Sequence, residues 1–171
     1  MTIDETLSPE WRSTNHAPLA VHDPVKGGAV TASMRVLLLG ATGTIGMATA
    51  RALVQRGHQV VCLLRPSRRD QNLQANAARP DSLTGVTVLW GDASDPEVWS
   101  QQPLTQERFD AVISCMASRT GSPQDAWRVD HQAHVWALKA AQAAGVRHFV
   151  QLSAICVQKP LLAFQRAKLA F

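Results

Sequence analysis

The residues of this chain whose spacing most clearly indicates a binding site are three glycines three positions apart, Gly40, Gly43 and Gly46. A turn without side chains lets backbone N–H groups approach phosphate oxygens closely. We expect Gly40 to permit a tight turn, Gly43 to admit a pyrophosphate, and Gly46 to let a helix pack closely on a strand. The residues that would surround the phosphates are Gly40, Thr42, Gly43, Thr44, Ile45 and Gly46. The pattern therefore predicts a dinucleotide site.

The segments on either side of the glycines agree with this prediction. Residues 35–39 form a short apolar run, which is typical of a strand buried on both faces. After Gly46 apolar residues recur at helical spacing until Gly57, a common residue type at a helix end. Such a helix would direct its free N–H groups and the positive end of its dipole at the phosphates. The alternative is that the glycines only make a tight connection, but their place between a strand and a helix favours the dinucleotide.

Strands and helices alternate along the rest of the chain. Apolar runs predict strands over residues 59–64, 86–90, 109–114 and 148–152. Helices are expected to begin at Pro96 with Asp95 as cap, to run over 127–144 with Gly145 as stop, and to begin again at 160. This alternation predicts an α/β fold of the Rossmann type, a doubly wound parallel sheet with its ligand at the carboxyl ends of the strands.

Both ends of the chain lie outside this pattern. Residues 1–33 mix Pro, Ser, Thr, His and Gly without periodicity, so we expect a flexible amino-terminal arm. The last helix is still in mid-pattern at Phe171 and has no stop signal. We therefore expect residues 34–171 to form an NAD(P)-binding domain that is incomplete at its carboxyl end, truncated before a substrate lobe, and nearly inactive alone.

Composition narrows the class of protein. With 46% apolar and 18% charged residues, most of the chain should be globular. The net charge of +4 arises from scattered cationic residues, which suits a small anionic ligand and does not indicate nucleic acid. No apolar run reaches the ~18 residues of a membrane-spanning helix. Cys62, Cys115 and Cys156 each lie among apolar residues, so we expect reduced core thiols in a cytosolic-type compartment, and no metal site.

The end of the second expected strand bears on which dinucleotide binds. Enzymes that use NAD carry an acidic residue there for the ribose 2′-hydroxyl, whereas those that use NADP carry cationic residues. This chain has Arg65 at that point and no Asp or Glu between His58 and Arg69. Arg65, Ser67 and Arg68 can converge on a 2′-phosphate, so the sequence favours NADPH. The alternative for Arg68 is that it belongs to the loop surface.

Residues after the third and fourth expected strands complete the candidate cofactor site. Asp92 can meet the adenine edge through its carboxylate or through the neighbouring Ala93 N–H, and it can equally form a turn after Gly91. The backbone of Cys115 and Ala117 should line the nicotinamide side. All of these positions follow strands, so they should gather at one edge of the sheet.

The three glycines, the sequence GDASD at 91–95 and Ser153 resemble the short-chain dehydrogenase/reductase superfamily. Members normally carry a Tyr-x-x-x-Lys pair, in which the tyrosine is the acid or base and the lysine holds the nicotinamide ribose. Here the matching segment runs from Phe164 to Lys168, and the chain contains no tyrosine. Asp130 stands where related enzymes often carry asparagine. The resemblance implies that Lys168 holds the ribose, that Ser153 lies near the nicotinamide, and that the proton has another source.

A closer resemblance is carried by ASRTG at 117–121, by LSAICVQKPLL at 152–162 and by FQRAK at 164–168. These segments resemble the NADPH-using divinyl chlorophyllide a 8-vinyl-reductases of phototrophs, which are atypical members of the superfamily. The likeness covers residues 34–171. It implies hydride transfer from NADPH to the 8-vinyl group of a divinyl chlorophyllide or protochlorophyllide, in chlorophyll biosynthesis. The delocalised carbanion that results can be protonated by solvent or by a side chain, so positioning would supply most of the rate.

The same resemblance implies a tetrapyrrole substrate, a bacterial cytoplasm or a plastid as compartment, and no more than peripheral contact with a membrane. Lys159 would face a substrate carboxylate or lie on the surface. Arg119 would bind a phosphate or a substrate carboxylate, or belong to the loop surface. His131 and His134 are three apart on the long helix, but they lack a third ligand for a metal. The sequence carries no signature of an oligomeric state.

Two other functions stay open at this point. An NADP-sensing or scaffold protein of the same fold would explain the missing tyrosine, because it would do no chemistry. An isoflavone-reductase-like enzyme would use NADPH to reduce a different conjugated substrate. The lysine at position 168 favours an enzyme over a sensor.

Overall fold

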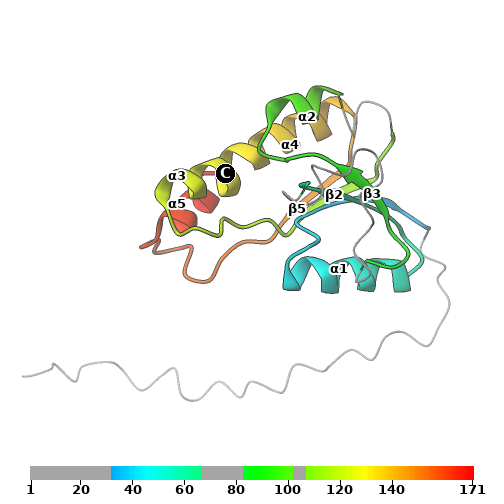
Figure 1. The fold of residues 1–171 in the computed structure, drawn as a ribbon, viewed down its shortest axis with the longest axis horizontal. Coiled ribbons are helices and arrows are strands. Elements are labelled where there is room, and N and C mark those ends of the chain that lie inside the picture. Colours follow the sequence, from blue (N-terminus) through cyan, green and yellow to red (C-terminus); the bar gives the residue numbers. More distant parts are fainter. Residues whose placement is uncertain (1–31, 67–82, 102–106) are drawn as a thin grey trace, which may run out of the picture. The chain divides into compact units, whose positions relative to one another are not determined.

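A parallel sheet of five strands lies at the centre of the described part of the chain (Figure 1). The strands are β1 (Arg35–Leu39), β2 (Gln59–Leu64), β3 (Thr87–Trp90), β4 (Ala111–Ser114) and β5 (His148–Gln151). Their order in the sheet is β3-β2-β1-β4-β5, and every neighbouring pair is parallel. This is the doubly wound Rossmann-type order that the sequence predicts, and the chain reverses its direction of winding between β1 and β4.

The structure, a computed structural model, describes residues 32–66, 83–101 and 107–171. Residues Ser33–Phe171 form one compact unit. Nearly all of the arm expected over residues 1–33 lies outside the described residues, as do Ser67 and Arg68 of the expected cofactor site. These three expectations therefore stay predictions.

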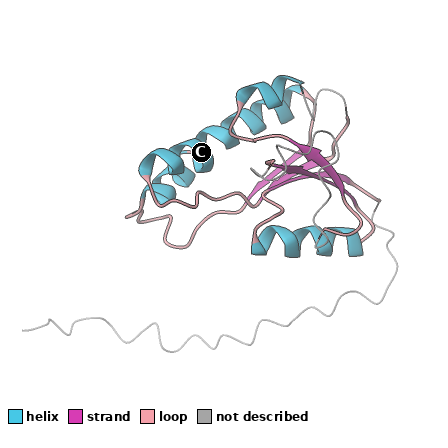
Figure 2. Ribbon diagram, in the orientation of Figure 1, coloured by secondary structure: helices cyan, strands magenta, loops and turns pink. Residues whose placement is uncertain are grey.

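Helices cover both faces of the sheet (Figure 2). Helix α1 (Thr44–Gln55) lies on one face, and α2 (Pro96–Gln101) and α4 (Ala133–Ala143) lie on the other. A four-residue helix α3 (Pro123–Ala126) and a π-helical segment η3 (Trp127–Gln132) lead directly into α4, and α5 (Ala163–Ala170) follows β5. The three helical segments from Pro123 to Ala143 are continuous in sequence.

Alternate residues of β1 belong to different halves of the core. Leu37 and Leu39 pack with Ala137 of α4, whereas Leu38 packs with Ala50 of α1, and the three leucines are 0% exposed. A strand that is covered on both faces needs apolar side chains at every position. This is why the continuous apolar run predicted β1 correctly.

The start of the long helix differs from the prediction. Helical structure begins at Pro123, four residues before the expected start at 127, because Ser122 Oγ accepts a hydrogen bond from Asp125 N at 3.1 Å. Proline at the first helical position after a serine cap is a common helix start. The carboxyl end of the long helix agrees with the prediction, since α4 ends at Ala143 and Gly145 follows with φ +71°.

The cysteines correct a second expectation. Cys62 is buried in β2, where burial raises the pKa of its thiol to about 12, and Cys115 is half-buried. Cys156, however, is exposed and has φ +60° in the loop after β5. The apolar neighbours of Cys156 in sequence do not bury it, because Ile155 beside it is itself 88% exposed.

Within residues 32–66, 83–101 and 107–171, no helix combines the length and apolar character needed to cross a membrane. The same residues contain no cluster of three or more His, Cys, Asp or Glu side chains that could hold a metal ion.

Candidate functional site

The glycine turn is pressed against the end of β4. Gly40 has φ +76°, and a Cβ added there would lie 2.8 Å from the Cys115 carbonyl carbon and from Met116 N. Cys115 N also donates to Leu39 O at 2.9 Å, so the pairing of β1 with β4 continues to this point. Gly40 therefore serves both the turn and the close approach of the two strand ends.

The other two glycines have different surroundings. A Cβ on Gly46 would lie 2.1 Å from Gly40 O, so only glycine lets α1 start so close to the turn. A Cβ on Gly43 would meet only Gly40 O, at 3.5 Å. The fold thus needs glycine at Gly46 for packing, whereas Gly43 borders open space of the kind a bound pyrophosphate would occupy.

The start of α1 can receive an anion. Gly43 is its N-cap and supplies no side-chain oxygen to the first N–H groups, and the first turn contains no acidic residue. Thr42, Thr44 and Ile45 are exposed around this helix start. Free N–H groups, the helix dipole and the open space at Gly43 together fit a dinucleotide phosphate.

Arg65 and Asp92 lie at the ends of β2 and β3, on the same edge of the sheet. Arg65 Nη1 is 3.9 Å from Asp92 Oδ2, and 58% of the Arg65 side chain is exposed. Asp92 Oδ1 accepts from Ser94 N at 2.9 Å and from Ser94 Oγ at 2.7 Å. Asp92 therefore forms the turn that the sequence offered as one of its two roles, while Arg65 stays accessible to a ligand.

Ala93 contributes to the same edge through its backbone. Its side chain is buried in the core, and its carbonyl accepts from Trp99 Nε1 at 2.9 Å. This bond fixes the loop between β3 and α2, which would border the adenine.

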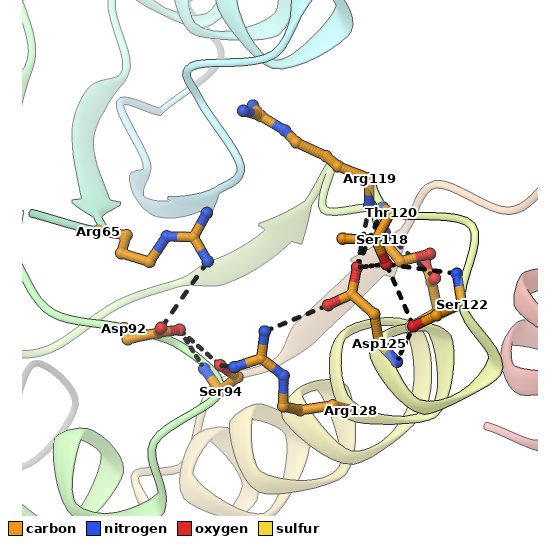
Figure 3. A network of polar contacts seen from close by, with 10 residues as sticks. Arg65, Asp92, Ser94, Ser118, Arg119, Thr120, Ser122, Asp125 and Arg128 are labelled. Carbon is orange, nitrogen blue, oxygen red and sulfur yellow. Dashed lines mark hydrogen bonds and ion pairs between the residues drawn. The ribbon is translucent and has the colours of Figure 1, made fainter. Parts of the chain in front are cut away.

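Asp125 organises the segment that follows β4 (Figure 3). Its Oδ2 accepts from Thr120 Oγ1 at 2.9 Å, from Arg119 N at 3.2 Å and from Thr120 N at 3.3 Å. The hydrogen bond from the Thr120 hydroxyl is the largest cause that lowers the pKa of Asp125 to about 2. The Arg119 side chain points away from this cluster in Figure 3, on the side where Arg65 lies.

Lys168 of α5 is buried and connects the loops after β4 and β5. Its Nζ donates to Met116 O at 3.2 Å and to Leu152 O at 3.0 Å, and it lies 3.2 Å from Asp130 Oδ1. Asp130, fully buried in η3, accepts from Ser118 N at 3.2 Å through Oδ2. Two of the ammonium protons of Lys168 are thus donated to backbone carbonyls, and Asp130 supplies the opposite charge, so the lysine holds together the backbone segments where the nicotinamide side is expected.

The remaining predicted residues are less tightly held. Cys115 and Ala117 follow β4 as expected, and Ser153 follows Leu152 directly and is exposed, as are Lys159 and Arg119. Within the described residues, no hydrogen bond or ion pair engages the Ser153 hydroxyl, the Lys159 amine or the Arg119 guanidinium. The fold therefore gathers the glycine turn, Arg65, Asp92, Cys115 and Lys168 along the carboxyl edge of the sheet, and the side chains of Ser153, Lys159 and Arg119 stay accessible to solvent.

His134 and Ser114 form a buried hydrogen-bonded pair beneath this edge. His134 Nδ1 lies 3.0 Å from Val129 O, and a carbonyl can only accept, so Nδ1 carries the proton. His134 Nε2 then accepts from Ser114 Oγ at 2.7 Å. Burial first, and the charge of Lys168 second, lower the pKa of His134 to about 4. A neutral histidine with both nitrogens occupied by protein is not a metal ligand here.

This histidine should make the folded protein sensitive to acid. Between the ordinary pKa of 6.5 and about 4, the unfolded chain binds a proton that folded His134 does not, so stability is full above 6.5 and falls as the pH drops. The loss should reach about 3 kcal/mol at pH ~4. Urea unfolding at several pH values measures the free energy of unfolding. Its slope against pH should become flatter in His134→Gln and stay unchanged in His131→Gln. An equal slope in His134→Gln would contradict this origin.

Three polar contacts near the candidate site were not predicted from the sequence. Asp130 could be placed in sequence but not paired with Lys168, because 38 residues separate them and the pairing depends on how α5 returns to the sheet. Arg128 and Ser94 carry no local signal of their contact. For Asp125 a signal exists, since Ser122 and Pro123 mark a helix start three residues before it.

Comparison with known proteins bears on this site. A family model described as NAD(P)H-binding matches residues 40–170. The divinyl chlorophyllide a 8-vinyl-reductase of Oryza sativa subsp. indica is 42% identical over 136 residues, 80% of this chain and 34% of that protein. The photosystem II assembly factor Ycf39 of Synechocystis is 33% identical over 120 residues, 70% of this chain and 33% of that protein.

A solved structure shares the fold. The Bordetella bronchiseptica enzyme WbmG in complex with NAD and UDP superimposes with a TM-score of 0.63 at 18% identity, over 81% of this chain and 47% of that one. This likeness confirms the Rossmann-type architecture. The chain spans about a third of the length of the curated relatives that it matches.

Proposed function

The chain belongs to the NAD(P)H-binding family, and from this premise we propose that it binds NADPH for reduction of the 8-vinyl group of a divinyl chlorophyllide or protochlorophyllide to an ethyl group. The observation that carries the proposal is the 42% identity to the divinyl chlorophyllide a 8-vinyl-reductase of rice. The proposed compartment is the cytoplasm of a bacterial phototroph, or a plastid.

The preference for NADPH over NADH rests on Arg65. Its guanidinium is exposed at the end of β2, where an enzyme specific for NAD would carry a carboxylate. A charge-assisted hydrogen bond to a 2′-phosphate contributes about 1.5–3 kcal/mol. Ser67 and Arg68, as well as the backbone of Ala93, would complete the adenosine end.

Residues near the ends of β4 and β5 would orient the nicotinamide. NADPH, when bound, supplies the hydride for the vinyl group. Lys168 would hold the nicotinamide ribose by exchanging one of its two carbonyl contacts for a ribose hydroxyl, with Asp130 as its counter-charge. Ser153, whose hydroxyl is exposed just beyond Leu152, would lie beside the ring. No phenol is required, because hydride addition to a conjugated vinyl group leaves a stabilised carbanion for solvent or another side chain to protonate.

The loop between β5 and α5 offers a surface for an apolar macrocycle. Ile155 is 88% exposed, Leu161 82% and Leu162 56%. Leu162 also lines a hollow of about 120 Å³, together with Ser118, Gly121, Ala126, Ala163 and Phe164. Lys159 of the same loop, or Arg119, would attract the substrate carboxylate. Apolar exposure beside free cations is the combination that a tetrapyrrole acid would need.

An assay of the complete protein with NADPH and a divinyl chlorophyllide tests the proposal. We expect NADPH absorbance to fall while the Soret band of the pigment shifts to the blue, with both changes at the same rate. A mono-vinyl pigment serves as the control and should give neither change. Binding of NADPH with no pigment reduction would favour a sensor or scaffold, and oxidation of NADPH by another conjugated substrate alone would favour a different reductase.

A further inference from the structure

Arg128 of η3 connects polar residues of the loop after β3 with polar residues of the segment between β4 and η3 (Figure 3). Its Nη1 donates to Ser94 Oγ at 3.0 Å, and its Nη2 donates to Asp125 Oδ1 at 3.2 Å. Ser94 donates to Asp92 within the loop after β3, and Asp125 of α3 accepts from Thr120 of the segment before that helix. One side chain therefore links the loop after β3 to the segment after β4.

The sheet order makes this link informative. Strands β2 and β1 lie between β3 and β4, so the loops after β3 and β4 are not neighbours through the sheet. Adjacent strands are about 4.8 Å apart, which places the ends of β3 and β4 roughly 14 Å from each other. The two intervening strands are followed directly by Arg65 and by the glycine turn. The Arg128 bridge thus joins the two loops that flank Arg65 and the glycine turn in the sheet order, where the adenosine half of a dinucleotide would lie.

We propose that Arg128 is a positioning residue for the adenosine half of the cofactor, because it holds the loop at 91–95 and the segment at 119–125 at a fixed separation. The inference rests on the cofactor part of the proposed function and is independent of the substrate. Through Ser94 the bridge also fixes Asp92, which faces Arg65 at 3.9 Å. Neither Arg128 nor Ser94 need touch the reacting atoms for this role.

The geometry of the bridge suits arginine. Two separate nitrogens of the rigid guanidinium fork each reach one acceptor, an arrangement that lysine, with a single nitrogen, does not reproduce. The side chain is 48% exposed, so its ion pair with Asp125 adds little to folding stability. Loss of the bridge should therefore appear in nucleotide affinity rather than in unfolding.

Nucleotide titrations of the chain and its variants test the inference. NADPH is followed by its fluorescence, and 2′,5′-ADP, which lacks the nicotinamide half, by displacement of NADPH. Arg128→Gln and Arg128→Lys should each weaken both nucleotides to the same extent, by about 3–10-fold, with the melting temperature of the free protein nearly unchanged. Ser94→Ala removes the same bond from the other side, together with the hydrogen bond from Ser94 Oγ to Asp92 Oδ1, and should give at least as large a loss. Arg128→Gln combined with Ser94→Ala should be no weaker than Ser94→Ala alone.

Arg166→Gln is the matched control. It removes the same charge from the exposed face of α5, and its affinities should equal those of the unchanged chain. Unchanged affinity in a folded Arg128→Gln would overturn the inference, as would a loss confined to NADPH or an equal loss in Arg166→Gln. If the unchanged chain binds neither NADPH nor 2′,5′-ADP, it is the cofactor part of the proposed function that fails.

Discussion

Replacing Gly43 by alanine should weaken NADPH binding about tenfold or more while the free energy of unfolding stays nearly the same. Gly43 has φ −81° and ψ 161°, a conformation that alanine adopts without strain, and an added Cβ would meet only Gly40 O at 3.5 Å. The new methyl group would instead occupy the space proposed for the pyrophosphate, at a cost of about 1–3 kcal/mol. Fluorescence titration with NADPH and urea unfolding measure the two quantities.

Gly46→Ala is the control for this experiment. Its Cβ would lie 2.1 Å from Gly40 O and 2.9 Å from Ala41 Cα, so the turn and α1 must move apart. We expect this variant to lose stability and NADPH binding together. If Gly43→Ala binds NADPH as tightly as the unchanged chain, the phosphates do not lie over Gly43 and the proposed site is wrong.

Replacing Arg65 by glutamate should weaken NADPH by about 100-fold and change NADH much less. The substitution removes a charge-assisted hydrogen bond and places a carboxylate beside the 2′-phosphate, whereas NADH has only a hydroxyl there. Because the Arg65 side chain is 58% exposed and its contact with Asp92 is 3.9 Å long, the fold should not suffer. Competitive titration with both nucleotides gives the ratio of affinities.

Arg51→Glu provides the same change of charge on the exposed side of α1 and should leave the ratio unaltered. An equal loss of NADPH and NADH in Arg65→Glu would contradict a contact with the 2′-phosphate. If the ratio of NADPH to NADH affinity falls in Arg51→Glu as well, the preference for NADPH comes from net charge and not from a contact of Arg65.

The central strands could be predicted from sequence because burial on two faces leaves a continuous apolar run. The bounds predicted for β1 and β2, residues 35–39 and 59–64, agree with the structure. The roles of Gly40 and Gly46 also agree, since a positive φ and a close approach have no substitute for glycine. Fold and turn thus follow from local rules that the sequence displays.

The polar contacts of the site could not be predicted, because they join residues that only the sheet order brings together. Lys168 was expected at the nicotinamide ribose, but its buried pairing with Asp130 depends on the packing of α5 against η3. The π-helical turn that contains Asp130 has no local signature in sequence. Such turns occur often at functional sites, which agrees with the place of η3 beside the candidate site.

The exposed loop after β5 is a case in which an apolar sequence did not indicate burial. Its residues are apolar, so the sequence suggested a buried environment for Cys156, yet Cys156 and Ile155 face solvent. Apolar character alone therefore does not distinguish a core segment from a surface that awaits a ligand.

Transfer of deuterium from the reduced nicotinamide to the pigment is the most direct test of the proposed chemistry. The complete protein is incubated with divinyl chlorophyllide and NADPH deuterated at C4 of the nicotinamide, and the product is examined by mass spectrometry and NMR. We predict one deuterium in the 8-ethyl group, with the second new hydrogen taken from solvent or an exchangeable side chain. An ethyl product without deuterium from either C4-deuterated form of NADPH, or no ethyl product at all, would contradict the account.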